Sequence, residues 1–295
     1  MCSEIVEGSR TRAPLAILLD RWPLLAGLCV LGIPVLVQLA EQAWTLETGV
    51  HGPLILATWL WLLYRGFDEN RVLIAPGRLG LALAVIVPAL IFFIATWAFD
   101  FISLYVAAAV VIVIAVLYLE LGPAVSRAMW FPMAYGVFLI PPPGYAVDVV
   151  TLPIKTVISN VVTGVLSGVG YPIVRSGVSL YISQYQLLVE DACSGLQSLF
   201  SLMALGLFYV YLMHRSEWRY ALVLALFIIP AAIFANFVRV MAIVLMTYYF
   251  GDETAQGFLH TSTGMLLFVV TLLSVFVLDR LLAPLRERLS ARGAA

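Results

Sequence analysis

The chain has 295 residues, of which 63% are hydrophobic and 11% are charged. Charged residues make up about a quarter of an ordinary soluble domain, so this composition excludes a soluble globular protein. The formal net charge is −1, and the basic residues stand singly along the sequence. Because they form no patch, the charge pattern indicates no nucleic-acid partner.

Apolar runs of membrane-spanning length recur along the sequence. A segment of about 20 apolar residues is needed to cross a hydrocarbon core of about 30 Å. The runs are continuous and do not alternate with polar residues, which favours helices over a β-barrel. We therefore expect an all-α polytopic membrane protein.

The first run, from Trp22 to Leu39, follows Arg10, Arg12 and Arg21 and superficially resembles a signal peptide. Its length and the lack of a small-residue cleavage site predict a retained span instead. We expect about eight spans, at residues 22–40, 51–64, 79–98, 101–119, 129–140, 194–213, 220–249 and 259–282. Together they predict a single integral-membrane domain over residues 1–295, divided into N-terminal spans (22–140), an outer-face segment (141–192), C-terminal spans (193–282) and a cytoplasmic tail (283–295).

The segment between the fifth and sixth expected spans has a different pattern. From Tyr145 to Val169, apolar residues recur at helical spacing with polar interruptions, which predicts a helix lying in the membrane interface. From Ile173 to Val189, β-branched and aromatic residues alternate around a Ser176-Gly177 turn signal, which predicts a small β-hairpin.

The distribution of basic residues predicts the orientation of the chain. With the N-terminus inside, 13 of the 16 basic residues fall in inner segments, whereas only Lys155 and Arg175 fall outside and Arg239 lies within a span. This asymmetry is a positive-inside signal. It requires that residues 145–170 do not cross the membrane, and it places both termini in the cytoplasm.

Three reactive side chains are expected at one depth near the outer face. Cys193 and His260 begin the sixth and eighth spans at their outer ends. Arg239 lies 19 residues above Tyr220, which corresponds to a rise of about 28 Å and brings it close to the outer interface. Asn236 lies three residues before Arg239 on the same helical face.

Each of these residues also has an ordinary structural interpretation. A lone cysteine such as Cys193 often serves only for packing, although the Ser194-Gly195 pair after it and a helix N-terminus favour an accessible thiol. An intramembrane arginine is functional or paired, and Asp191 is a candidate partner for Arg239. His51, at the outer start of the second span, is a secondary candidate for the site. His214 is expected in an inner loop, too far from Cys193 to serve it.

These residue types support nucleophilic acyl transfer. A thiolate can attack a peptide carbonyl, a histidine can transfer protons, and a fixed cation can stabilise the oxyanion. Neither a His-Glu-x-x-His motif nor a Gly-x-Ser-x-Gly motif occurs, so metal-dependent and serine-hydrolase chemistry are disfavoured and no cofactor is expected. Three cysteines, Cys2, Cys29 and Cys193, make a structural disulfide unexpected.

Several sequence blocks resemble the exosortase/archaeosortase family. The matching blocks, which run roughly from His51 to Leu278, are Ala192-Cys193-Ser194-Gly195-Leu196 with Ser198-Leu199, Ala235-Asn236-x-x-Arg239-Val240, Gly257-x-x-His260-x-x-x-Gly264, His51-Gly52 and Phe131-Pro132…Ile140-Pro141. The family usually has Glu before the Ala-Cys pair and Arg four residues after the Cys, where this chain has Asp191 and Gln197. These departures leave open the subtype and the signal motif that it recognises.

The resemblance implies a multi-pass cysteine protease or transpeptidase of the bacterial inner membrane, with its active site facing the periplasm. Cys193 would be the nucleophile, His260 the general acid/base and Arg239 the transition-state stabiliser. The implied partners are membrane-anchored proteins with a C-terminal signal, consisting of a short motif such as Pro-Glu-Pro, a transmembrane helix and a basic cluster.

Two other functions are compatible with parts of the sequence. A transporter would use Arg239 and Asn236 to line a substrate path and would not depend on Cys193. A non-catalytic scaffold for surface-polysaccharide export would tolerate the loss of both Cys193 and His260. The sequence leaves open the acceptor that resolves the acyl-enzyme and the oligomeric state.

Overall fold

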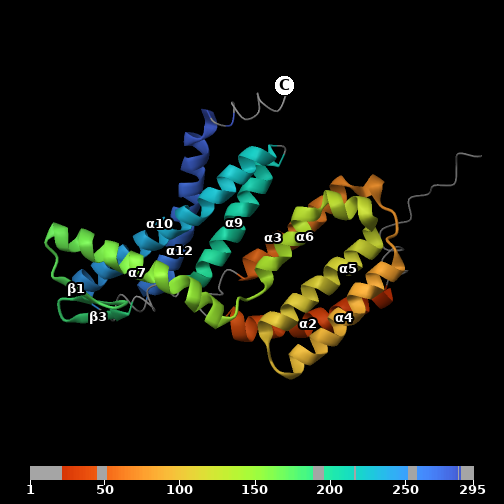
Figure 1. Cartoon of the computed structure of the whole chain (residues 1–295), viewed down its shortest axis with the longest axis horizontal. Coiled ribbons are helices and arrows are strands. Elements are labelled where there is room, and N and C mark those ends of the chain that lie inside the picture. Colours follow the sequence, from red (N-terminus) through yellow and green to blue (C-terminus); the bar gives the residue numbers. More distant parts are fainter. Residues whose placement is uncertain are drawn as a thin grey trace, which may run out of the picture.

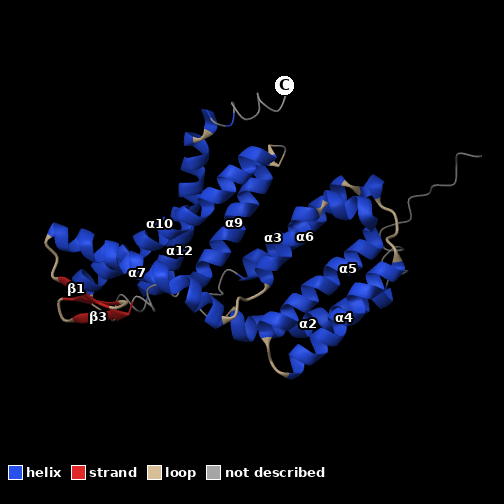
Figure 2. Cartoon of the chain, viewed as in Figure 1, coloured by secondary structure: helices blue, strands red, loops and turns tan. Residues whose placement is uncertain are grey.

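The computed structural model of the chain describes residues 22–44, 52–188, 196–215, 217–251, 258–284 and 286. Helices account for most of these residues, and a small sheet lies at one edge (Figure 2). The N-terminal half contains α2 (Trp22–Gln38) with the π-helical turn η1 (Leu39–Ala43), α3 (Gly52–Glu69), η2 (Arg71–Leu73), α4 (Leu79–Ala98), α5 (Ile102–Ala128), α6 (Trp130–Tyr135) and η3 (Gly136–Leu139). The C-terminal half contains α7 (Gly144–Val169), β1 (Ile173–Ser176), β2 (Ser179–Ile182), β3 (Tyr185–Leu188), α9 (Leu196–His214), α10 (Trp218–Phe250) and α12 (Phe258–Leu281).

Four helical segments of the described chain are long and apolar enough to cross a membrane. They are residues 22–43, which combine α2 and η1, then α4, α5 and residues 219–250 of α10. These four coincide with expected spans. The expected spans at 51–64, 194–213 and 259–282 also form helices (α3, α9 and α12), but they are not among the four, so a total of eight spans stays a prediction. The expected span at 129–140 forms only the six-residue α6 and a 3₁₀ turn, and six residues rise only about 9 Å.

The outer-face segment consists of a helix and a sheet, as expected, but the sheet is larger than a hairpin. It is a three-stranded antiparallel meander in the order β1-β2-β3. The strands are joined by two-residue turns whose first residues, Gly177 and Ser183, have φ values of 62° and 53°. Such positive φ values are typical of the tight turns that suit antiparallel strands. The second turn adds β3, because it reverses the chain again four residues after the first.

Helix α7 and the sheet enclose one end of α10. Buried side chains of α7 pack with inward-facing residues of the sheet and with the second half of α10. The cluster comprises Ile158, Val162 and Leu166 from α7, Ile173, Leu180, Ile182 and Leu187 from the sheet, and Val240, Ile243 and Val244 from α10. Figure 1 shows α7 lying across α10 beside the sheet.

The two halves of the chain meet along α9. Near one end of this helix, Tyr211 stacks on Phe131 of α6 with ring centroids 4.2 Å apart and planes at 9°. Toward its other end, Phe200 contacts Phe138 of η3 edge-on, with centroids 5.8 Å apart. Just beyond α9, Arg215 forms an ion pair with Glu69 at the end of α3.

The described segments that the sequence predicts to be inner loops lie together at one end of the molecule, which we call the basic end. The Glu69–Arg215 pair links the end of α3 to the α9–α10 loop, and Glu217 pairs with Arg286 beyond α12 at 2.6 Å. The segment after α3 is joined to α5, because the Gly77 amide donates to the Leu119 carbonyl at 2.8 Å. We call the opposite end of α9, α10 and α12 the Arg239 end.

The junction of α5 with the segment after α3 depends on Gly122. This residue has φ +80°, and a Cβ added to it would lie 1.9 Å from the carbonyl oxygen of Ala75. We expect Gly122→Ala to destabilise the fold by more than about 2 kcal/mol, because a left-handed conformation is strained for alanine and the backbone of residue 75 must also move. The measurement is unfolding in detergent micelles followed by circular dichroism.

Gly80→Ala is the matched control for that substitution. Gly80 lies in α4 with open space around its Cβ position. Since alanine has a higher helix propensity than glycine, this variant should be unchanged or more stable by up to about 1 kcal/mol. Equal stabilities of the two variants would contradict the role assigned to Gly122.

The ion pair between the two halves should make stability depend on pH. Hydrogen bonds from Arg215 and then from Arg65 lower the pKa of Glu69 below its ordinary value of 4.5. The stabilisation is therefore complete above pH 4.5 and is lost as the pH falls through the lower folded-state value. We expect Glu69→Gln to cost up to about 1 kcal/mol of unfolding free energy at pH 7, since the pair is largely solvent-exposed. The difference from the unmodified protein should shrink below pH 4.5.

Asp68→Asn serves as the control for the Glu69 measurement. Asp68 pairs with Arg71, three residues later in the chain, at 2.9 Å, so this pair does not link the two halves of the molecule. Asp68→Asn should lower the free energy of unfolding by less than Glu69→Gln does. A Glu69→Gln effect that is the same at pH 7 and pH 3 would rule out the ionic origin.

Candidate active site

Helix α10 carries the intramembrane arginine that the sequence singled out. Arg239 is 3% exposed, and Asn236, one turn earlier on the same face, is fully buried. Placing an arginine at the centre of a spanning helix costs at least about 2.5–3.5 kcal/mol on insertion scales. The burial of both side chains within the protein separates them from lipid, as expected for a functional or paired group.

The surroundings of Arg239 restrict access to it from one side. Val240, Ile243 and Val244, which follow it on α10, are buried against α7 and the sheet. Thr247, one turn further, is also buried, and its hydroxyl donates to the carbonyl of Ile243 at 2.9 Å. The sheet and α7 thus cover α10 immediately beyond the arginine.

The pairing of α10 with α12 relates Arg239 to His260. At the basic end, the hydroxyl of Tyr220 on α10 donates to Oδ1 of Asp279 on α12 at 2.8 Å. Arg239 lies 19 residues after Tyr220, and His260 lies 19 residues before Asp279. Because the helices are antiparallel neighbours, both arms rise about 28 Å from the hydrogen-bonded pair. Arg239 and the His260 backbone therefore both lie toward the opposite end of this helix pair.

The pairing of these two helices continues beyond a proline. Pro230 lies inside α10, where proline removes a backbone hydrogen bond. Past it, Ala232 and Ala235 are buried against Val270 of α12. These small residues allow close approach of the two helices, so α10 and α12 remain paired toward the Arg239 end.

Several predicted site residues lie outside the described part of the chain. These residues are His51, Asp191, Cys193, Ser194 and Gly195. His260 lies in the first turn of α12, although its side chain is not among those described. The residues described on either side of Cys193 are Leu188, which ends β3, and Leu196, which begins α9.

The start of α9 lies toward the same end of the bundle as Arg239. The Nε2 atom of His214, the last residue of α9, is 3.0 Å from Oδ1 of Asp279. Leu196 precedes His214 by 18 residues, a rise of about 27 Å toward the Arg239 end. The described chain therefore resumes, three residues after Cys193, at the end of the bundle that holds Arg239 and the start of α12.

Sequence reasoning missed two buried polar groups. His214 was expected in an inner loop, but it ends α9 and is 3% exposed, because Asp279 and Tyr220 enclose it. Lys155 was expected in an interfacial helix, but it is 7% exposed. It shares the buried face of α7 with Thr151 and Ser159, and the four-residue spacing of these polar positions was the available signal.

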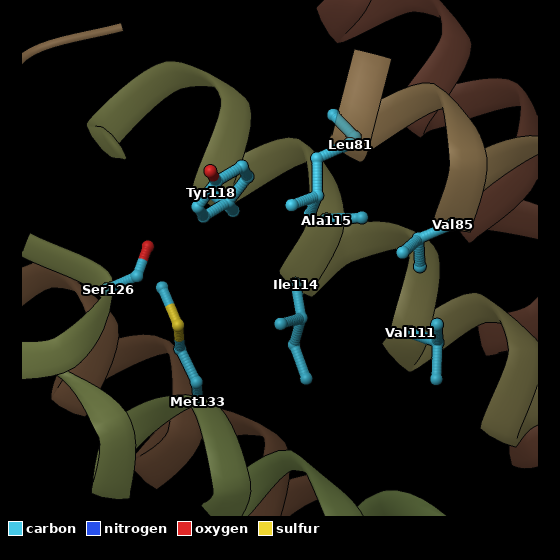
Figure 3. Close-up of a pocket in the computed structure, with 9 residues that line it drawn as sticks. Leu81, Val85, Val111, Ile114, Ala115, Tyr118, Ser126 and Met133 are labelled. Carbon is cyan, nitrogen blue, oxygen red and sulfur yellow. The ribbon is translucent and has the colours of Figure 1, made fainter. Parts of the chain in front are cut away.

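A separate cavity in the N-terminal half differs from this site in its chemistry. It has a volume of about 270 Å³ and is lined mainly by apolar side chains of α4 and α5, several of which converge in Figure 3. Its two hydroxyl-bearing residues are Tyr118 and Ser126, and the Ser126 hydroxyl already donates to the Gly122 carbonyl at 2.8 Å. The cavity therefore offers apolar contact and no nucleophile with a base.

Among the residues whose placement is described, no group of three or more His, Cys, Asp or Glu side chains could hold a metal ion. The described polar groups near Arg239 are an amide, a hydroxyl and the guanidinium itself. Such groups can bind and orient an anion or a carbonyl oxygen through hydrogen bonds.

Comparisons with known proteins identify the family. No curated protein and no solved structure matches the chain. The family model described as transmembrane exosortase matches residues 43–277, which include α3 to α10 and most of α12. This range contains the blocks around Cys193, Arg239 and His260, and it extends over most of the sequence. The chain belongs to the transmembrane exosortase family.

Proposed function

We propose that this protein is a membrane-embedded cysteine protease or transpeptidase that cleaves C-terminal sorting signals. Cys193 is the nucleophile, His260 the general acid/base, and Arg239 the donor that stabilises the oxyanion. Asn236, Asp191, Ser194, Gly195 and His51 support the site. The observation that supports the proposal is the burial of Arg239 in α10, toward the end of the bundle at which α9 and α12 begin.

The reaction has two acyl-transfer steps. The Cys193 thiolate adds to the scissile carbonyl, and the guanidinium of Arg239 binds the developing oxyanion. The tetrahedral intermediate collapses as His260 gives a proton to the leaving amine, which leaves a thioester on Cys193. A water molecule, amine or hydroxyl then attacks the thioester after losing its proton to His260, and the thiolate is released.

The charge distribution supports a location of the site at the outer face. The basic end holds Arg215 and Arg286 together with the other described segments predicted as inner loops, which favours a cytoplasmic position for this end under the positive-inside rule. The Arg239 end then faces the periplasm of a bacterial inner membrane, and both termini are cytoplasmic. A substrate anchored by its own C-terminal helix would present its short motif at this outer surface, with its basic cluster on the opposite side.

The first test of this proposal removes the nucleophile. Cys193→Ala should abolish processing of a co-expressed protein that bears the signal, while the enzyme remains in the membrane at its normal level. The matched control is Cys29→Ala, because Cys29 is exposed on α2 and far along the chain from the site. The Cys29→Ala enzyme should process the signal-bearing protein at an unchanged rate. Normal processing by Cys193→Ala would refute the proposal and would favour a transporter or scaffold.

The second test separates the charge of Arg239 from its geometry. Loss of one oxyanion donor costs about 10²–10³ in rate in other acyl-transfer enzymes, so we expect Arg239→Gln to slow processing by at least about 100-fold. Arg239→Lys keeps the charge but not the planar fork and should retain intermediate activity. Single-turnover formation of the Cys193 thioester, followed by mass spectrometry, measures this step. Equal rates of thioester formation in the unmodified protein and in both variants would exclude Arg239 from the reaction.

A further inference from the structure

A partly buried carboxylate at the basic end, with a side chain that is 15% exposed, joins the three helices that carry the proposed site. Asp279 of α12 accepts hydrogen bonds from Tyr209 of α9 to Oδ2 and from Tyr220 of α10 to Oδ1, each at 2.8 Å. His214 of α9 lies with Nε2 3.0 Å from Oδ1, and its ring meets that of Tyr220 edge-on at 4.8 Å. The Tyr220 hydroxyl also lies 3.1 Å from the backbone carbonyl of Asp279.

The distances from this cluster along the helices are nearly equal. From His214, Tyr220 and Asp279, arms of 18, 19 and 19 residues lead to Leu196, Arg239 and His260, respectively. Each arm rises about 27–28 Å. The cluster thus joins the three helices at one end, at nearly equal sequence distances from Leu196, Arg239 and His260.

The apolar contacts between these helices define their axial register less strictly. Ridges of similar aliphatic side chains can repack after a slip of one turn, which is about 5.4 Å along the axis. A slip of that size would move Asp279 beyond hydrogen-bonding distance of both tyrosines and cost the partly buried carboxylate its hydroxyl donors. It would also move His260 by one turn relative to Arg239.

We propose that Asp279, with Tyr209, Tyr220 and His214, is the register anchor that holds the His260 helix level with Arg239 and with the chain after Cys193. These four residues act by positioning, because they lie about 28 Å from the reacting groups. The inference rests on the proposed function for its catalytic consequence, but not for its structural one. Effective acyl transfer needs reacting atoms within about 3–3.5 Å, so a slip of a single turn would block the reaction.

The structural consequence is tested by a distance between α10 and α12. Spin labels are attached at the exposed positions Phe250 and Val269 after replacement of the native cysteines. Asp279→Ala should shift or broaden the distance distribution by up to about 5 Å, one helical turn. Tyr209→Phe combined with Tyr220→Phe removes both hydroxyl donors while keeping the rings, and it should act in the same direction. This second variant decides the question if Asp279→Ala does not fold.

Glu217→Gln is the control at the same end of the bundle. Glu217 pairs with Arg286 at the exposed surface, so its loss should leave the distance distribution unchanged. An unchanged distribution in a folded Asp279→Ala protein, or in the double tyrosine variant, would overturn the anchor. This result is independent of catalysis, so it stands even if Cys193 proves dispensable for processing.

The catalytic consequence is tested by the thioester-forming step. Asp279→Ala should lower the single-turnover rate at least 10-fold without weakening substrate binding, because the anchor touches no substrate. Asp279→Asn keeps one acceptor oxygen and should recover part of the rate. Equal losses in Asp279→Asn and Asp279→Ala, or a loss confined to substrate affinity, would contradict a positioning role.

Discussion

The carboxylate of Asp279 is the constraint on which the proposed site depends. A spanning helix has few means of setting its height, because lipid is as apolar as the side chains it replaces and gives no preference for one register over another. Polar contacts provide that preference, since hydrocarbon offers no alternative hydrogen-bonding partners. Asp279 concentrates these contacts at one point, where a single side chain meets two helices through hydroxyl groups and an imidazole.

This arrangement separates the anchoring of the helices from the chemistry. Donors around Asp279 occupy the basic end, whereas Arg239 and Asn236 are buried toward the opposite end, just before the part of α10 that α7 and the sheet cover. A site that must admit a peptide cannot also be filled by contacts that lock the helices together. Locking them about 28 Å away leaves the Arg239 end able to accept a substrate.

Some of this structure could be predicted from the sequence, because certain residues and patterns have the same energetic consequence in any fold. Arg239 was identifiable alone, because a charge inside an apolar run is costly in any fold. The bounds of α4 were predictable from hydropathy, since residues 79–98 form one uninterrupted apolar run. The third strand was missed because the Ser183-Gln184 turn lacks a glycine and carries only a weak turn signal.

The Asp279 cluster was inaccessible to sequence reasoning for a different reason. Tyr209 and Asp279 are 70 positions apart, and tyrosine is common at membrane interfaces for reasons unrelated to hydrogen bonding with a carboxylate. Only the folded arrangement reveals that Tyr220 and Asp279 meet. The sequence shows that Tyr220–Arg239 and His260–Asp279 are intervals of equal length. These intervals bear on the site only because Tyr220 and Asp279 are in contact in the fold.

The N-terminal half of the chain helps to position α9. Helix α9 begins three residues after Cys193, so its position bears on the nucleophile. The N-terminal half supports α9 near both ends, through Phe138 against Phe200 and Phe131 against Tyr211, and Glu69 adds an ion pair beyond His214. The family match begins at residue 43, just before α3, which contributes Glu69 to this support. Helix α2 lies before the match, and Val35 of α2 and Leu39 of η1 pack on α5. The matched range, residues 43–277, therefore comprises α9, α10 and most of α12 together with the part of the N-terminal half that supports α9.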